Sequence, residues 1–309
     1  MKDAQPDLSP VDRNAAHRLS LGLLALAGVT YGLIVLGALV RAHGAGLACP
    51  DWPLCFGEVI PEFDFKVAFE WGHRVLAGSV GLVFLGLSAL VLRRPGLRGR
   101  CGPGLAIAAL LLAVQIVLGG LTVLELLATW TVTSHLVTGN AFALALVLIA
   151  RRLRWIGAGS PSAGPTASPL QRFTTTLAAS MLLVQVVLGG LVSSSYAGLA
   201  CPDWPTCMHG EFFPTWRGIQ GLHLLHRMVG YATLVAIAAC AWLAREHPGT
   251  RRWLATAAGL AALQVAVGVA NVLLRIPVEI TGLHSALAAG LVCTLGVSLR
   301  EAWRGARVR

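Results

Sequence analysis

The stretch AGLACPDWPLC at Ala45–Cys55 returns as AGLACPDWPTC at Ala197–Cys207, so ten of eleven positions match. The two copies begin 197 − 45 = 152 residues apart in a chain of 309 residues. A sequence that repeats at half of its own length is typical of two copies of one structural unit joined by a linker. The repeat therefore predicts a duplicated fold, with one pair of cysteines in each half.

The composition indicates that both halves lie in a membrane. Hydrophobic residues make up 56% of the chain and charged residues 12%, whereas a soluble domain has about a quarter charged residues. The mean hydropathy is +0.71. We therefore expect an all-α membrane protein, with eight transmembrane helices arranged as two tandem pseudo-symmetric four-helix bundles. The predicted spans, each near the roughly 20 residues that cross a bilayer, are 18–41, 70–92, 103–124, 130–150, 173–194, 222–244, 253–274 and 279–299.

A linker is predicted between the two bundles. The segment 152–172 is rich in Pro, Gly, Ser and Ala and cannot bury an apolar face. It separates an N-terminal bundle, 1–151, from a C-terminal bundle, 173–309. Since four spans return the chain to the side on which it began, we expect parallel repeats related by an axis along the membrane normal.

The odd-numbered spans share a short motif. Gln115–Leu121 (QIVLGGL) is matched by Gln185–Leu191 (QVVLGGL), and more loosely by Leu33–Leu39 (LIVLGAL) and Gln264–Ala270 (QVAVGVA). Each copy carries a small residue, which we expect to let helices approach closely.

The charge distribution predicts the orientation of the chain. The net charge is +10, and 18 of the 24 Lys and Arg residues fall on one side of the predicted spans. The positive-inside rule makes that side cytoplasmic, with both termini inside and both cysteine loops outside. These basic clusters need no nucleic-acid partner. In bacteria the outer compartment is oxidising, so disulfides persist there.

Four histidines form the most informative pattern. His73 and His135 lie near the outer ends of the second and fourth spans, and His226 and His284 near those of the sixth and eighth. Each is about one turn inside its helix, so each pair lies at one depth. Two facing imidazoles in a four-helix bundle can bind a haem iron from both sides. Alternatively, the four histidines could be buried core residues or could line a transport path. Four ionisable groups at matched depth favour the haem sites instead.

Glu70 is the acid that breaks the symmetry between the halves. It occupies the position that His223 holds in the second half, and it lies three residues before His73 on the same helix face. A carboxylate there could exchange protons with a haem edge or stabilise positive charge on it. An exposed interfacial glutamate, or one paired with Arg74, is the alternative. We favour a catalytic role, with the second half as an electron-carrying copy.

The close cysteine pairs are expected to form disulfides, Cys49–Cys55 and Cys201–Cys207. Their spacing is not that of covalent haem attachment, and neither loop offers enough ligands for zinc. For Cys49–Cys55 a structural and a redox role both stay open, whereas for the second pair we favour a structural one.

Arginines near the outer ends of the spans are candidate contacts for haem propionates, because a guanidinium can bind a carboxylate with two hydrogen bonds. Interface anchoring explains them equally well. They are Arg41, Arg74, Arg227 and Arg275.

Taken together, these residues resemble the haem A synthase family, including the bacterial relatives of the mitochondrial enzyme. The resemblance covers the chain from the first span to the eighth. It rests on the doubled CPDWPxC loops, the ExxHR of Glu70–Arg74, the LHR of Leu225–Arg227, and His135 and His284.

The resemblance implies an enzyme of the bacterial cytoplasmic membrane. It would oxidise the C8 methyl group of haem O to a formyl group by successive hydroxylations, for haem-copper oxidase biogenesis. His73 and His135 would hold the substrate haem, and His226 and His284 a haem b cofactor. Glu70 matches the essential acid of the family.

The resemblance leaves other points open. Cys49 and Cys55 match the cysteine pair of the first loop, but some family members lack it, so its role need not be catalytic. The implied partners are haem O synthase, haem-copper oxidase assembly factors and the lipid bilayer. Whether the protein forms a homo-oligomer, and which electron acceptor it uses, stay open.

Other classes of protein explain less of the sequence. A bis-histidine di-haem membrane cytochrome b, acting only in electron transfer, would show the same four histidines but leave haem unchanged. A thiol–quinone oxidoreductase would use the cysteines and leave the histidines without a role. A transporter would place its polar groups near the midplane of the membrane.

Overall fold

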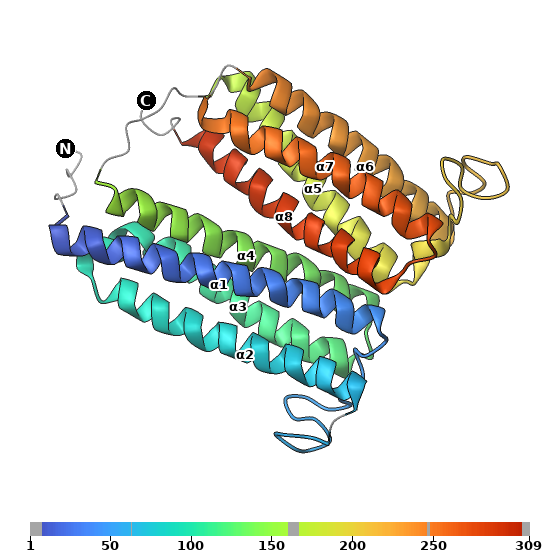
Figure 1. The fold of residues 1–309 in the computed structure, drawn as a ribbon, viewed down its shortest axis with the longest axis horizontal. Helices are drawn as coiled ribbons and strands as arrows, with labels where there is room; N and C mark the ends of the chain where they lie inside the picture. Colours follow the sequence, from blue (N-terminus) through green and yellow to red (C-terminus); the bar gives the residue numbers. More distant parts are fainter. Residues whose placement is uncertain (1–7, 63, 160–166, 246–247, 305–309) are drawn as a thin grey trace.

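The computed structural model describes residues 8–62, 64–159, 167–245 and 248–304. Within these ranges the chain forms eight long α-helices and one short 3-10 helix, which confirms the predicted all-α class (Figure 1). Each α-helix is long and apolar enough to cross a membrane, so this is a multi-pass membrane protein. The helices are α1 (Pro10–Ala42), α2 (Phe65–Leu92), α3 (Pro95–Leu124), α4 (Thr129–Gly157), α5 (Pro169–Ser194), η1 (Ala197–Leu199), α6 (Gly218–Leu243), α7 (Pro248–Leu273) and α8 (Val278–Trp303).

Several helices extend beyond the predicted spans where the basic residues cluster. Helix α1 begins at Pro10, eight residues before the predicted start, because the Ser9 hydroxyl accepts the Asp12 N–H at 3.1 Å. Helix α5 begins in the same way at Pro169, after the capping Ser168. A hydropathy pattern ends at the first charged residues, whereas a helix ends where its backbone is capped.

The third helix and the linker differ from the prediction for the same reason. Helix α3 begins at Pro95, so Pro103, the predicted start, lies inside the helix. Helix α4 continues to Gly157, and α4 and α5 together take up both ends of the predicted linker. Its middle, 160–166, lies outside the described residues.

Each half of the chain packs as a ring of four helices. Helices α1, α2, α3 and α4 contact one another in that order, and α4 closes the ring against α1. Helices α5 to α8 do the same, with α8 against α5. Helices α2 and α4 are therefore at opposite corners of one bundle, and α6 and α8 at opposite corners of the other.

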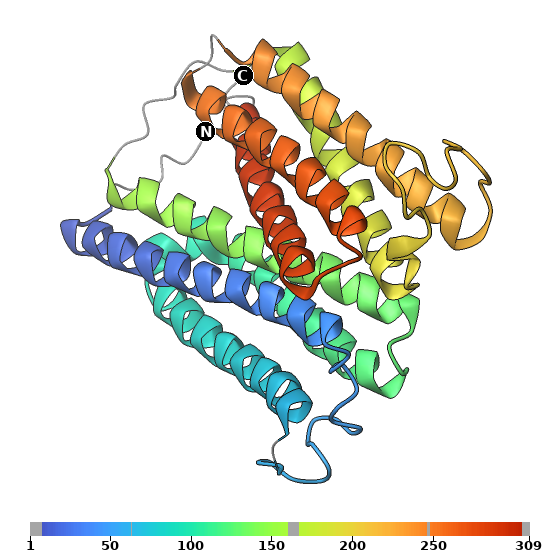
Figure 2. The ribbon, with the colours of Figure 1, turned by 45° about the vertical axis from the view of Figure 1, so that its right-hand side comes forward.

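The two bundles lie side by side (Figures 1 and 2). Helices α1 and α4 contact α8, and α4 also contacts α5. The Tyr31 hydroxyl of α1 donates to the Ala286 carbonyl of α8 at 2.9 Å. A Cβ at Gly190 of α5 would lie 2.9 Å from Thr133 Cγ2 of α4, so glycine allows this close approach. Each bundle also has its own apolar core, around Phe84 and around Ile237.

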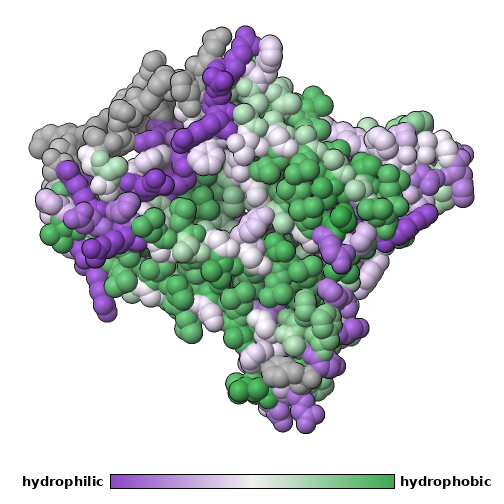
Figure 3. Space-filling model, in the orientation of Figure 1, coloured by the Kyte–Doolittle hydropathy of each residue, from purple (hydrophilic) through white to green (hydrophobic). Residues whose placement is uncertain are grey.

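The molecule has two polar ends and an apolar middle. We call the end that carries the loops 43–64 and 195–217 the cysteine end, and the opposite end, where α1 begins and α8 ends, the arginine end. In Figure 3 hydrophobic side chains cover the middle of the visible face, and hydrophilic ones gather toward both ends. A surface of this kind suits a lipid environment, with its polar ends in water.

Candidate functional site

The four histidines lie deeper in their helices than the one turn that we predicted. His73 is eight residues after the start of α2 (73 − 65), and His226 is eight after the start of α6 (226 − 218). His135 and His284 are each six residues into α4 and α8 (135 − 129 and 284 − 278). At 1.5 Å per residue these are depths of about 9 to 12 Å. The prediction missed the early helix starts after the loops. It also gave the two histidines of each pair one depth, whereas they lie eight and six residues into their helices, in the same way in both halves.

A glycine on a neighbouring helix faces each imidazole. In all four cases a Cβ on that glycine would lie 3.0 to 3.2 Å from the imidazole Cε1, which is closer than ordinary carbon contacts. The glycines are those of the motif shared by the odd-numbered helices. The sequence predicted a small residue there for helix packing, but its close neighbour is an imidazole. The pairs are Gly37 with His73, Gly119 with His135, Gly189 with His226, and Gly268 with His284.

Three of the four imidazoles also hydrogen-bond a glutamine that the sequence analysis did not single out. In each case the amide comes from the same motif, four residues before the glycine. The glutamine Nε2 lies 3.2 Å from His135 Nε2, 3.1 Å from His226 Nδ1 and 3.2 Å from His284 Nε2. The glutamines are Gln115, Gln185 and Gln264. Their common place in three motif copies is the signal that could have identified them.

The histidine pairs have features that suit haem ligands. His73 of α2 and His135 of α4 come from opposite corners of one bundle. The Nδ1 atoms of His73, His135 and His284 are buried and have no hydrogen-bond partner among the described residues. Such atoms are unfavourable inside a bundle unless a ligand takes them, and imidazole nitrogens are good iron ligands.

The second bundle offers the same arrangement. His226 of α6 and His284 of α8 come from opposite corners of that bundle. In the described part of the chain, no group of three or more His, Cys, Asp or Glu side chains could hold a bare metal ion. Two imidazoles are nonetheless sufficient for haem, because the porphyrin supplies the remaining nitrogen ligands. The geometry therefore suits haem better than a free ion.

Glu70 is buried and joins α2 to the first cysteine loop. Glu70 is only 4% exposed, which excludes the alternative of a glutamate exposed to water. The carboxylate accepts the Cys49 N–H at 2.9 Å and the Arg74 guanidinium at 2.6 Å. Arg74 also donates to the carbonyls of Cys49, Asp51 and Leu54, at 3.1, 2.7 and 2.7 Å. Glu70 and Arg74 thus hold the loop over the helix that carries His73.

The second half repeats this arrangement with an imidazole in place of the carboxylate. His223 Nδ1 lies 2.9 Å from the Ala197 carbonyl, and Arg227 donates to His223 Nε2 at 3.2 Å. Arg227 also donates to the Cys201 carbonyl at 2.6 Å and to the Thr206 carbonyl at 3.1 Å. A ring that donates through one nitrogen and accepts through the other is neutral. The two histidine pairs therefore differ by one buried carboxylate.

Both predicted disulfides are present. The Sγ atoms of Cys49 and Cys55 are 1.98 Å apart, those of Cys201 and Cys207 are 2.09 Å apart, and all four residues are buried. Each bond closes a loop in which an aspartate accepts backbone N–H groups from one or two residues after the second cysteine. This stapling role is visible in the geometry.

Asp51 is the turn residue of the first loop. Its carboxylate accepts the Gly57 N–H at 2.8 Å and the Phe56 N–H at 2.7 Å. These bonds, chiefly the one from Gly57, hold the pKa of the Asp51 carboxyl below its ordinary value. Asp203 accepts the His209 N–H at 3.0 Å in the second loop.

The four arginines expected near haem propionates mostly have other partners. Arg74 and Arg227 hold the loops, as described above. Arg41 donates to the Ser193 hydroxyl at 2.9 Å and to the Ser193 carbonyl, and it lies over the Tyr196 ring, 4.9 Å from its centroid. It therefore joins α1 to α5. Arg275 is exposed, in a left-handed backbone conformation.

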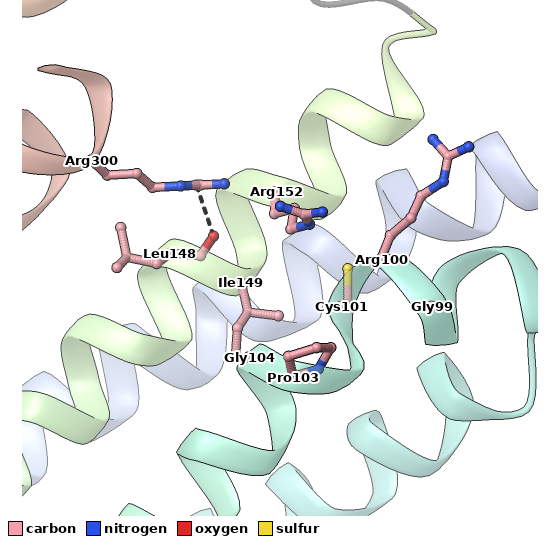
Figure 4. Close-up of a pocket in the computed structure, with 9 residues that line it drawn as sticks. All are labelled: Gly99, Arg100, Cys101, Pro103, Gly104, Leu148, Ile149, Arg152 and Arg300. Atoms are coloured by element: carbon pink, nitrogen blue, oxygen red, sulfur yellow. Dashed lines mark hydrogen bonds between the residues drawn. The ribbon is translucent and has the colours of Figure 1, made fainter. Parts of the chain in front are cut away.

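A cavity of about 330 Å³ lies at the arginine end, far along the helices from the histidines. Figure 4 shows three arginines around it, from α3, α4 and α8, and Arg300 donates to the Leu148 carbonyl at 3.1 Å. The other two are Arg100 and Arg152. The lining holds guanidinium groups and no histidine, so it does not belong to the site described above.

Comparison with known proteins covers nearly the whole chain. Residues 21–295 match the sequence model of a family described as cytochrome oxidase assembly protein, COX15-CtaA. A protein of Shewanella oneidensis named Heme A synthase is 30% identical, over 85% of this chain and 90% of its own length. Proteins of the same name from Methylobacterium sp. and Brucella ovis are 28% and 29% identical. They cover 98% and 92% of this chain, and 97% and 91% of their own lengths.

Proposed function

We propose a function from the premise that this chain belongs to the COX15-CtaA family of cytochrome oxidase assembly proteins. It is a haem A synthase, an oxidoreductase that converts the C8 methyl group of haem O to a formyl group by successive hydroxylations. One observation carries the proposal beyond the shared name of the relatives. Two similar histidine pairs lie in one chain, and a buried carboxylate stands one turn from a ligand of only the first pair.

The two pairs have different tasks in this proposal. His73 and His135 hold haem O as substrate, and His226 and His284 hold haem b as a resident cofactor. The bound haems supply the iron-based oxidation and electron-transfer chemistry. Buried, unpartnered ring nitrogens in both bundles support this assignment. The two bundles that would hold these haems lie in direct contact.

Glu70 acts at the edge of the substrate haem. It lies one turn nearer the cysteine end than His73, and it pairs directly with Arg74 at 2.6 Å. A buried carboxylate in this position stabilises positive charge that develops on a ring substituent, and it can accept a proton there. The loop above it, closed by Cys49–Cys55, shields the site from water.

The location follows from the charge pattern. The arginine end faces the bacterial cytoplasm, and the cysteine end faces outward. Residues 1–151 form the substrate bundle and 173–309 the cofactor bundle. Haem O synthase supplies the substrate, and assembly of haem-copper oxidases consumes the product.

The decisive experiment measures haem composition. The chain is expressed with a source of haem O, and extracted haems are identified by chromatography and mass spectrometry. Wild-type protein should produce haem A. Glu70→Gln, which retains an acceptor for the Cys49 N–H, should bind haem but produce no haem A. His223→Gln is the matched change in the other bundle and should retain haem A production.

The same experiment tests the competing function. A di-haem cytochrome b would bind haem through all four histidines and leave its composition unchanged in every variant. Wild-type protein that carries haem but yields no haem A would therefore overturn the synthase and support the cytochrome.

A further inference from the structure

The four histidine environments follow a pattern of three and one. His135, His226 and His284 each have a glutamine amide within 3.2 Å of a ring nitrogen. The ring of His73 has no hydrogen bond to any described residue, and its Nδ1 is buried. The exception falls on a ligand of the proposed substrate haem.

The sequence explains the exception. In α3, α5 and α7 a glutamine precedes the histidine-facing glycine by four residues, and residues four apart lie on one face of a helix. In α1 the glycine that faces His73 is Gly37, and the residue four before it is Leu33. Leu33 is partly buried and packs against the apolar core of the bundle. The fourth position of the pattern is thus filled by a side chain of similar size that cannot hydrogen-bond an imidazole.

Gln115 is held from both sides, which makes it an effective support for its histidine. Its Nε2 contacts His135, its Oε1 contacts the Thr138 hydroxyl, and its amide lies 3.0 Å from where a Cβ on Gly139 would stand. Gln185 packs against Gly230 in the same way. The two ends of such an amide exchange places by a half-turn, and with Oε1 toward the ring it accepts the N–H of the nitrogen that does not bind iron. A group held in this way restricts rotation of the ring and strengthens it as a ligand.

We infer that the three glutamines are positioning residues for their histidines, and that Leu33 makes His73 the exchangeable ligand. This inference rests on the proposed function, which assigns the first pair to a substrate and the second to a cofactor. A substrate haem must enter and leave, so one weakly oriented ligand is useful. A cofactor must stay, and both of its ligands have an amide. His135, whose ring is oriented by Gln115, is then the firmly held ligand of the substrate haem.

The test measures haem release. Wild-type protein, reconstituted with haem b, is mixed with excess apomyoglobin, and haem transfer is followed by absorbance. We expect a fast phase from the first bundle and a slow phase from the second. Leu33→Gln should slow the fast phase by about 2- to 10-fold, the range that one hydrogen bond gives. Leu33→Met, of similar size without an amide, should leave it unchanged.

Reciprocal variants keep the inference testable if one variant fails to fold. Gln115→Leu should speed the fast phase alone, and Gln185→Leu should speed the slow phase alone. The low-spin electron paramagnetic resonance signal of the affected haem should shift with each, because it reports ligand orientation. Combining Leu33→Gln with Gln115→Leu should restore the wild-type rate in part.

Two results would overturn the inference. One is a fast phase that is the same in Leu33→Gln and Leu33→Met, and the other is faster release from Leu33→Gln, as expected if the amide competes with iron. Neither depends on haem A production. A protein that makes no haem A but shows the predicted release pattern would refute the synthase and leave the inference about the ligands standing. A protein that makes haem A without that release pattern would refute the inference and leave the synthase standing.

Discussion

Gly119 is the residue at which a single methyl group should act on His135, a proposed haem ligand. A Cβ there would lie 3.1 Å from His135 Cε1, so Gly119→Ala must move the imidazole. Glycine to alanine in a helix otherwise stabilises by about 1 kcal/mol. We therefore expect unchanged or higher thermal stability without haem, together with haem affinity up to about tenfold weaker, the cost of a strained side-chain rotamer. Haem titration followed by absorbance measures the affinity.

Gly28→Ala is the matched control. Gly28 lies in α1, is exposed, and has no heavy atom within 4 Å of an added Cβ. It should gain the same helical stability and keep full haem affinity. Equal affinity in the two variants would show that the glycine opposite His135 is not required for the ligand.

At this scale the sequence points to candidate ligands more readily than to the residues that contact them. A histidine within a span is rare and costly, so four of them at matched positions point to function. Gln115 carries no such signal, because a lone glutamine in an apolar helix is compatible with many roles. Only its contact with His135, formed between two helices, shows what it does. The role proposed for Leu33 is harder still to predict from the sequence, because it depends on Leu33 lacking the amide that the glutamines carry at the same motif position.

The two cysteine loops use one set of devices at the scale of the element. Each has a buried disulfide, an aspartate that caps its turn, and an arginine from the following helix that binds its carbonyls. They differ in where their tryptophans go. Trp52 packs against α3, 3.1 Å from a Cβ placed at Gly120, whereas Trp204 donates to the Tyr231 hydroxyl at 3.0 Å. Each tryptophan therefore contacts its own bundle, but through a helix at a different place in the ring, α3 in the first half and α6 in the second.

Acid should open the first loop. The pKa of the Asp51 carboxyl is lowered by the Gly57 and Phe56 N–H groups, so its stabilising contribution is present above the ordinary carboxyl pKa. It is lost as the pH falls through the lowered value. We expect a phosphine to reduce the buried Cys49–Cys55 bond faster at acid pH. The freed thiols are alkylated, and the mass that this adds to the protein is measured by mass spectrometry.

Asp51→Asn is the comparison for this prediction. An amide cannot ionise and offers one acceptor instead of two, so reduction should be faster than in wild type at neutral pH and should change little with acid. The same acid dependence in both proteins would mean that another group controls the loop.

Helix ends show why the elements were predicted with errors of up to eight residues. Hydropathy identified each apolar middle, because the bilayer imposes it. The ends depend on caps such as Ser9 and on prolines that suit a first turn, such as Pro95, and these lie among charged residues. The predicted depth of the histidines inherited the same error.

For the whole molecule, the charge asymmetry predicts which end faces the cytoplasm. Glu62→Cys, exposed at the cysteine end, should react in intact cells with a maleimide that cannot cross the inner membrane. Arg98→Cys, exposed at the arginine end, should react only after the membrane is permeabilised. Wild-type protein gives the background from native thiols. Labelling of Arg98→Cys in intact cells would invert the proposed orientation.

The two bundles are joined at both ends by arginines that cross between them. At the cysteine end Arg41 of α1 binds Ser193 of α5. At the arginine end Arg151 of α4 pairs with Glu301 of α8 at 2.7 Å, with side chains 17% and 10% exposed. Arg304 also lies 3.6 Å from Glu301, so this one acid offsets several cations.

Because the Arg151–Glu301 pair joins the two halves, its contribution to the stability of the protein can be measured. A partly buried pair lies between exposed pairs and fully buried ones, so each single change should destabilise by about 1–3 kcal/mol. Glu301→Gln should cost more than Arg151→Gln, because it leaves two arginines without their acid. In the double variant the losses should not add, since the second change removes a charge that the first left unpaired. Thermal unfolding in detergent measures all four proteins. Additive losses would show that Arg151 and Glu301 do not act as a pair between the bundles, while haem binding at the far end should be the same throughout.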